Sequence, residues 1–201
     1  RAPMVKGYNP HDVASPFLDE EEQSKYRSLI GTLLYIVNTV RVDICFPVNM
    51  LSQFMSAPRK THIHAAQKVF QYLMFTKDQG VVYGPNAPLN IEYQDFRLID
   101  RTKENKPVIT QDYPKETGYR ITAISDSDYA TDKEDRKSQW GHCVFINNQL
   151  VSWSSRKQKS VALSTAEAEY VALSEAARSS IYFRNLLNEV GLNCAYVNLV
   201  G

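Results

Sequence analysis

The strongest constraint on this chain is the placement of acids after an apolar strand and at the start of a helix. The apolar run Ile121–Ser125 ends in Asp126, and Glu169 follows about forty residues later in the string Ser164–Leu173. A fold that joins a strand end to a helix start makes a site of carboxylate oxygens. Such oxygens bind Mg²⁺ or Mn²⁺, and paired ions of this kind hydrolyse phosphodiesters. The sequence therefore predicts phosphodiester chemistry at this point of the fold.

Spacing decides which acids are candidates for catalysis. Asp126 and Asp128 alternate along a strand, so both can face one site, although a solvated acidic turn is the alternative. Glu167 and Glu169 point roughly 200° apart around a helix and cannot share a target. Ser164 with Glu167 three residues later forms a capping box, which gives Glu167 a structural role. We assign catalysis and metal binding to Asp126 and Glu169, with Asp128 as a further candidate metal ligand.

Six basic residues gather in two short loops that flank the predicted strands: Lys133, Arg136, Lys137, Arg156, Lys157 and Lys159. The net charge of the chain is only +1, so no global field would draw it to a polyanion. The two loops predict local contacts to the phosphates of a nucleic-acid backbone, which position a substrate without reading its sequence. Solvated loops are the alternative interpretation.

The first part of the chain favours helices. Residues 1–22 contain three prolines and end in the acidic string Asp19–Glu22, which predicts an extended connector running into a helix. Apolar residues at helical spacing then predict two helices within 23–55, meeting near 39–43, and a third over 60–76. Residues 80–83 and 89–93 suggest a hairpin of short strands, and the polar segment 95–118 a linker.

The periodicity changes after residue 118. Tyr119–Ser125, Trp140–Ile146 and Leu150–Ser154 predict three strands, with the second joined to the third by a turn at Asn147 and Asn148. A long helix follows from Ser164 to Glu189. Residues 195–200 can begin a fourth strand, but we expect a sheet that stops after three and leaves residues 119–126 as an unpaired inner edge.

Other features exclude alternatives. The three cysteines (Cys45, Cys143 and Cys194) are widely spaced and form no CxxC motif, which disfavours a disulfide framework or a zinc site and indicates a reducing compartment. No apolar run approaches ~20 residues, so we expect no membrane span. His62 and His64 lack a third metal ligand nearby, which favours helix capping or packing.

Several longer strings resemble one family, the Pol polyprotein of copia-type LTR retrotransposons. Strings within 25–36, 41–44 and 71–80 are similar to the tail of its reverse transcriptase. Strings within 125–130, 135–141, 151–158 and 164–173 are similar to its ribonuclease H domain. The resemblance covers about residues 20–93 and 120–192, which is most of the chain.

The resemblance implies an α/β fold: a ribonuclease H-like mixed sheet, incomplete at its C-terminus, after a mainly helical thumb and connection segment. The implied boundaries are 1–22 (connector), 23–94 (reverse-transcriptase tail), 95–118 (linker) and 119–201 (ribonuclease H-like part). The implied activity is hydrolysis of the RNA strand of RNA–DNA hybrids with two Mg²⁺ or Mn²⁺ ions, and the matching acids are Asp126 and Glu169. The implied partners are the hybrid and the rest of Pol, including the polymerase palm and integrase. The implied location is a cytoplasmic virus-like particle, with the nucleus as the alternative.

Two departures from the family pattern leave the activity open. The family's third acid ends a fourth strand after the long helix, yet no aspartate follows Glu189 here. The usual Thr-Arg-Pro-Asp-Ile reads Val40-Arg-Val-Asp-Ile44. The polymerase palm would lie before Arg1. Three functions therefore remain: part of a ribonuclease H, a non-catalytic transposon remnant, or a module that binds the hybrid.

Overall fold

Three helices and a four-stranded sheet with one long helix make up this computed structural model, which describes residues 2–5, 7–83 and 118–201. The helical unit contains α1 (Glu20–Thr39), a short 3₁₀ turn (Val42–Ile44), α2 (Cys45–Ser52) and α3 (Lys60–Phe75). The sheet unit contains β1 (Tyr119–Asp128), β2 (Gln139–Ile146), β3 (Gln149–Lys157), α4 (Thr165–Glu189) and β4 (Cys194–Val200). The first two helices, their meeting point and the third helix are confirmed as predicted.

The helical unit is held by one apolar stripe on α1. Tyr26, Ile30, Leu33 and Val37 recur at helical spacing and are all buried against α2 and α3. The acidic string before α1 caps it, because the Asp19 carboxylate accepts a hydrogen bond from the Glu22 backbone N–H at 2.8 Å. The helix predicted to follow the acidic string is present, but it begins at Glu20, within the predicted connector.

The Arg41–Ile44 string has a structural role in this unit. Arg41 is only 5% exposed and donates two hydrogen bonds to the Asp43 carboxylate, at 2.8 and 2.7 Å. It also donates to the carbonyl of Thr76 at the end of α3, at 2.9 Å. The Arg41 hydrogen bonds lower the pKa of Asp43. This paired arginine ties the turn between α1 and α2 to the end of α3.

The sheet has four strands in the order β3-β2-β1-β4. β2 pairs antiparallel with both β1 and β3, whereas β4 runs parallel to β1, with Ile124 opposite Val200. The predicted unpaired edge at 119–126 is therefore wrong: β1 is a central strand, and β4 forms that edge of the sheet. The three predicted strands are present but extend further, to Asp128, from Gln139 and to Lys157.

The predicted turn between β2 and β3 is confirmed. Asn147 and Asn148 adopt φ values of 47° and 65°, the left-handed conformation that a two-residue hairpin turn requires and asparagine tolerates. The Asn147 side chain also accepts a hydrogen bond from the Arg120 backbone N–H at 2.9 Å. The turn thereby fastens the hairpin to the start of β1.

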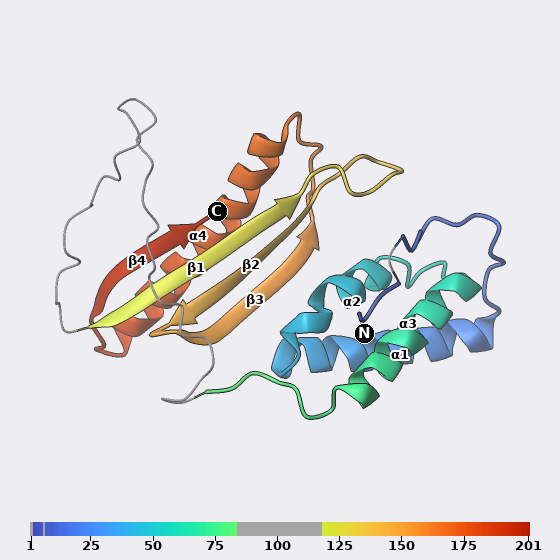
Figure 1. Cartoon of the computed structure of the whole chain (residues 1–201), viewed down its shortest axis with the longest axis horizontal. Helices are drawn as coiled ribbons and strands as arrows, with labels where there is room; N and C mark the ends of the chain where they lie inside the picture. The colour runs from blue at the N-terminus through green and yellow to red at the C-terminus, as the bar shows by residue number, and fades with distance from the viewer. Residues whose placement is uncertain (1, 6, 84–117) are drawn as a thin grey trace.

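Helix α4 lies against one face of the sheet (Figure 1), where it contacts β1, β2 and β4. The contact is made by small residues at every fourth position: Ala168, Ala172, Ala176 and Ser180 are all fully buried. Residues this small let the helix backbone approach the strands closely.

The two units meet along β3. In Figure 1 the three helices gather beside this strand, and α2 contacts it directly. Trp153 on β3 packs against the helical core, and its indole N–H donates to the carbonyl of Val37 at 2.9 Å. A half-buried indole that finds its acceptor across the joint fixes the helical unit to this edge of the sheet.

Two further predictions fall on the segment between the units. Residues 80–83 form no strand, so that half of the predicted hairpin is wrong. Its other half at 89–93, and the predicted linker except residue 118, lie outside the described residues. Within the described part of the chain, no helix is long and apolar enough to cross a membrane.

Because His62 and His142 are buried, we expect the stability of the protein to depend on pH. The ring nitrogens of His62 face the Arg59 backbone N–H at 2.9 Å and the Pro10 carbonyl at 2.7 Å, so the predicted capping role is confirmed. His142 pairs with the Ser179 hydroxyl at 3.1 Å. Burial lowers the pKa of both rings. The unfolded chain therefore binds protons more readily than the folded chain below about pH 6.5, and stability falls as the pH falls.

We expect the free energy of unfolding in urea to drop between pH 7 and pH 5, by about 1 kcal/mol for each buried histidine. The change His142→Gln should flatten this pH dependence, because glutamine does not titrate. The exposed His64→Gln is the matched control and should leave the slope unchanged. An equal slope in wild type and His142→Gln would contradict the assignment.

Candidate functional site

The predicted acids on β1 lie where the strand leaves the core. Burial of β1 persists through Ser125 and then ends, so Asp126 and Asp128 are both exposed. Asp126 stands opposite Gly141 of β2, which brings no side chain to that position. One Asp126 carboxylate oxygen accepts a hydrogen bond from the Ser127 backbone N–H at 2.8 Å. The carboxylate is thus held at the strand end and remains open to solvent.

The two glutamates of α4 have different environments, as predicted. Glu167 is bonded locally: its carboxylate accepts from the Leu163 backbone N–H at 2.6 Å, while the Ser164 hydroxyl accepts from the Glu167 N–H at 3.1 Å. The carboxylate thus reaches back one residue further than in a standard capping box. Glu169, one turn into the helix, is exposed.

The end of β4 reaches the same place. A Cβ built on Gly201 would lie 3.7 Å from Leu173 Cδ1 and 3.9 Å from Ser125 Oγ. Ser125 directly precedes Asp126, and Leu173 lies one turn beyond Glu169 on α4. In the parallel register that sets Ile124 opposite Val200, the next position after Gly201 falls opposite Asp126. Three elements from distant parts of the sequence therefore converge here.

The carboxylates at this point have the right chemistry for Mg²⁺ or Mn²⁺, which prefer oxygen ligands. Their number is insufficient, however. Among the residues that the structure describes, no three His, Cys, Asp or Glu side chains are grouped so that they could hold a metal ion. Asp126, Asp128 and Glu169 therefore do not form a three-ligand metal site by themselves.

The six predicted phosphate-binding residues divide into two groups. Lys137 and Lys157 form ion pairs within the protein. Lys137 pairs with Asp135 at 3.3 Å, and Lys157 pairs with Asp132 at 2.7 Å and with Asp135 at 2.9 Å. The other four are exposed and form no ion pair with any described residue; they are Lys133, Arg136, Arg156 and Lys159. These four are the cations available to a phosphate backbone.

A central carboxylate in this region was not predicted from the sequence. Asp132 accepts from Lys157 Nζ at 2.7 Å and from the backbone N–H groups of Glu134 and Asp135 at 2.8 and 3.3 Å. It also pairs with His11 of the N-terminal segment at 3.1 Å, and His11 in turn lies 2.7 Å from the Glu134 carboxylate. Asp132 therefore organises the loop 130–138 and connects it to a segment far away in the sequence.

The environment of Asp132 stabilises its charge. Burial opposes ionisation, but the hydrogen bonds from Lys157, from backbone N–H groups and from His11 hold the pKa of Asp132 well below its usual range. The sequence could have indicated the local hydrogen bonds of Asp132. An aspartate whose carboxylate accepts from the backbone N–H groups two and three residues later is a common turn motif. Its partners His11 and Lys157 could not be inferred from spacing.

We expect Asp132→Asn to destabilise the protein by about 1 kcal/mol, since it weakens several charge-assisted hydrogen bonds that are partly screened by solvent. It should also free Lys157 and loosen the loop that carries Lys133 and Arg136. Urea unfolding at pH 7 measures the first effect, and Asp128→Asn, on the exposed strand end, is the control. Equal stability of the two variants would show that Asp132 does not organise this loop.

Comparison with known proteins identifies the relatives of this chain. It is 30% identical over 171 residues, 85% of its length, to a retrovirus-related Pol polyprotein from transposon RE1 of Arabidopsis thaliana. It is 26% identical over 176 residues to a putative transposon Ty5-1 protein of Saccharomyces cerevisiae, 47% of which is covered. The chain spans about a tenth of the RE1 polyprotein.

A shorter relative is covered almost completely. The chain is 32% identical over 157 residues to the secreted RxLR effector protein 161 of Plasmopara viticola, matching 78% of this chain and 89% of that protein. No family model and no solved structure matches the chain. The relatives nevertheless agree with the strings that first suggested a transposon origin, and the chain belongs to the family of copia-type retrotransposon Pol proteins.

Proposed function

We propose that this chain is the reverse-transcriptase tail and the first part of the ribonuclease H domain of a retrotransposon Pol protein. In this role it acts in hydrolysis of the RNA strand of RNA–DNA hybrids. The observation that carries the proposal is the convergence of the end of β1, the first turns of α4 and the end of β4. Asp126 lies at the end of β1 and Glu169 one turn into α4, and both side chains are exposed.

The roles of the residues follow from their environments. Asp126 and Glu169 supply carboxylate oxygens of the kind that Mg²⁺ and Mn²⁺ prefer, and the ions would supply the activation of water for phosphodiester cleavage. The four cations without an ion-pair partner among the described residues (Lys133, Arg136, Arg156 and Lys159) bind the phosphates and orient the hybrid. Because two carboxylates do not complete a metal site, binding of the hybrid is the function that the described residues can perform alone.

A second candidate is a module that binds the hybrid without cutting it. It is favoured by the shorter relative, a separate protein of which 89% aligns with this chain. A segment that occurs outside a long polyprotein need not retain a complete catalytic site. The two candidates differ in cleavage and agree in binding.

An assay of hybrid binding and cleavage distinguishes the two candidate functions. Residues 1–201 should bind an RNA–DNA hybrid but cleave it hardly at all in Mg²⁺ or Mn²⁺, because the ions lack ligands. Adding an aspartate and a short flexible tail after Gly201 places a carboxylate opposite Asp126 and should raise metal-dependent cleavage. Asparagine in the same position is the control and should not.

Cleavage by residues 1–201 at the rate of a complete ribonuclease H would contradict the need for further acids. Binding without cleavage in both lengthened chains would favour the non-catalytic module.

A further prediction concerns the carboxylates of Asp126 and Glu169. In a chain long enough to be active, Asp126→Asn and Glu169→Gln should each reduce cleavage at least about a hundredfold, the lower end of what a positioned catalytic group contributes. Both residues are exposed, so circular dichroism and thermal unfolding should remain near wild type. Glu167→Gln is the matched control: glutamine still accepts the Leu163 hydrogen bond, so its effect should be mild. Equal losses from Glu167→Gln and Glu169→Gln would overturn the assignment.

A further inference from the structure

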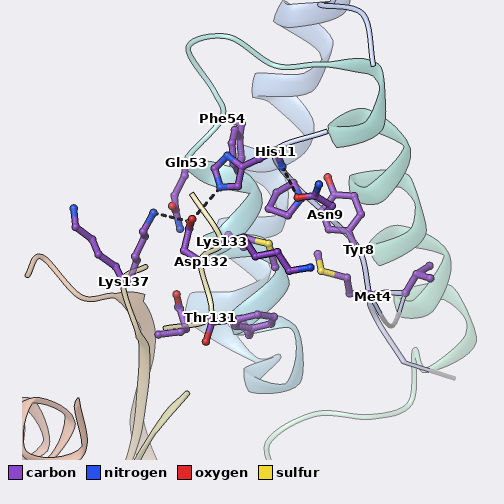
Figure 2. A pocket seen from close by; sticks show the side chains of 17 residues that line it. Met4, Tyr8, Asn9, His11, Gln53, Phe54, Thr131, Asp132, Lys133 and Lys137 are labelled. Carbon is purple, nitrogen blue, oxygen red and sulfur yellow. Dashed lines mark hydrogen bonds and ion pairs between the residues drawn. The ribbon is translucent and has the colours of Figure 1, made fainter. Parts of the chain in front are cut away.

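A cavity of about 360 Å³ lies between the two units, and neither Asp126 nor Glu169 lines it. Figure 2 shows its lining, which comes from three parts of the chain: residues 4–5 and 7–11 near the N-terminus, residues 46–54 in and after α2, and the loop 131–137 with neighbouring strand residues. This volume falls within the roughly 300–1,000 Å³ that small-molecule sites occupy, and junctions between units are where such sites are common.

One side of the cavity is apolar and rich in aromatic rings. Tyr8, Phe46 and Phe54 line it together with the thioethers of Met4 and Met50. Methionine sulfur and aromatic edges both make favourable contacts with flat rings. The shape and chemistry of this side therefore favour an aromatic ligand over a polar one.

The opposite side of the cavity carries a positive charge. Lys133 extends from its loop across the cavity towards Met4 and Tyr8 (Figure 2), and it has no ion pair within the described ranges 2–5, 7–83 and 118–201. Asp132 is the sole acid among the described lining residues, and Lys157 and His11 already occupy its carboxylate. An ammonium group directed into an apolar cavity is stabilised by an anion that pairs with it.

We propose that this cavity binds a small aromatic anion, whose ring packs among Phe46, Phe54 and the methionines and whose carboxylate or sulfonate pairs with Lys133. The inference goes beyond the proposed function, because neither Asp126 nor Glu169 lines the cavity; of the four cations assigned to the phosphates, Lys133 alone is among its described lining residues. The ligand contacts the N-terminal segment, α2 and the loop 131–137 at once. It therefore links the helical unit to the sheet unit and stabilises their joint.

Titration calorimetry of the full chain with 1-naphthalenesulfonate tests the proposal. We expect saturable binding of one molecule per chain. Lys133→Gln should weaken it at least about tenfold, the effect of losing a charge-assisted contact. Lys77→Gln is the matched control: this lysine is also exposed but lies outside the lining, so its variant should bind as wild type.

Two further probes separate the parts of the claim. The neutral 1-naphthalenemethanol should bind at least about tenfold more weakly than the sulfonate, because it offers no charge to Lys133. Decanoate, an aliphatic anion, should also bind more weakly, because it lacks the ring. Equal affinity of Lys133→Gln and wild type, equal affinity for the alcohol, or equal affinity for decanoate would each overturn the proposal.

Discussion

The contact between the small residues of α4 and the sheet positions everything at the candidate site. Ala168, Ala172, Ala176 and Ser180 present almost no side chain, so the helix backbone lies close to β1 and β2. This closeness brings Leu173 beside Gly201 and the turn bearing Glu169 beside the end of β1. A larger residue in the stripe would lift the helix and cost packing energy. It would also move Leu173 away from Gly201.

Charge in this protein is distributed by local pairing rather than by overall excess. Two of the six loop cations are paired with Asp132 or Asp135, which makes the loop 130–138 an ordered structure and not merely a basic segment. The remaining cations are then presented from fixed positions. Asp132 also pairs with His11 and so contributes to the contact between the units. The hydrogen bond from Trp153 to Val37 holds the units together at another point.

Much of the fold could be predicted because its signals are local. Helical periodicity predicted α1 to α3, the capping box of Ser164 and Glu167 predicted the start of α4, and two adjacent asparagines predicted the turn between β2 and β3. Strand β4 was underestimated because it is short, and its partner lies more than seventy positions earlier, at Tyr119–Ile124. Nothing in a local pattern reports such a parallel pairing. That the position after Gly201 falls opposite Asp126 could be inferred only from the register of this pairing.

In the candidate site, too, contacts between near neighbours could be predicted and contacts between distant segments could not. Glu167 and Glu169 could be separated by helix geometry, since capping is a contact between near neighbours. Lys157 was predicted as a phosphate ligand because its charge was visible in the sequence, whereas its two aspartate partners are twenty or more residues away. Ion pairs between distant segments are decided by the fold, so a basic loop alone does not indicate which of its charges are available.

The parallel pairing of β4 with β1 has a consequence for how the protein is made. A ribosome synthesises β1, the β2–β3 hairpin and all of α4 before the partner of β1 emerges, so early in translation one side of a central apolar strand has no backbone partner. Closing so long a loop is slow compared with forming helices and hairpins. During that interval the nascent chain is open to pairing with other strands.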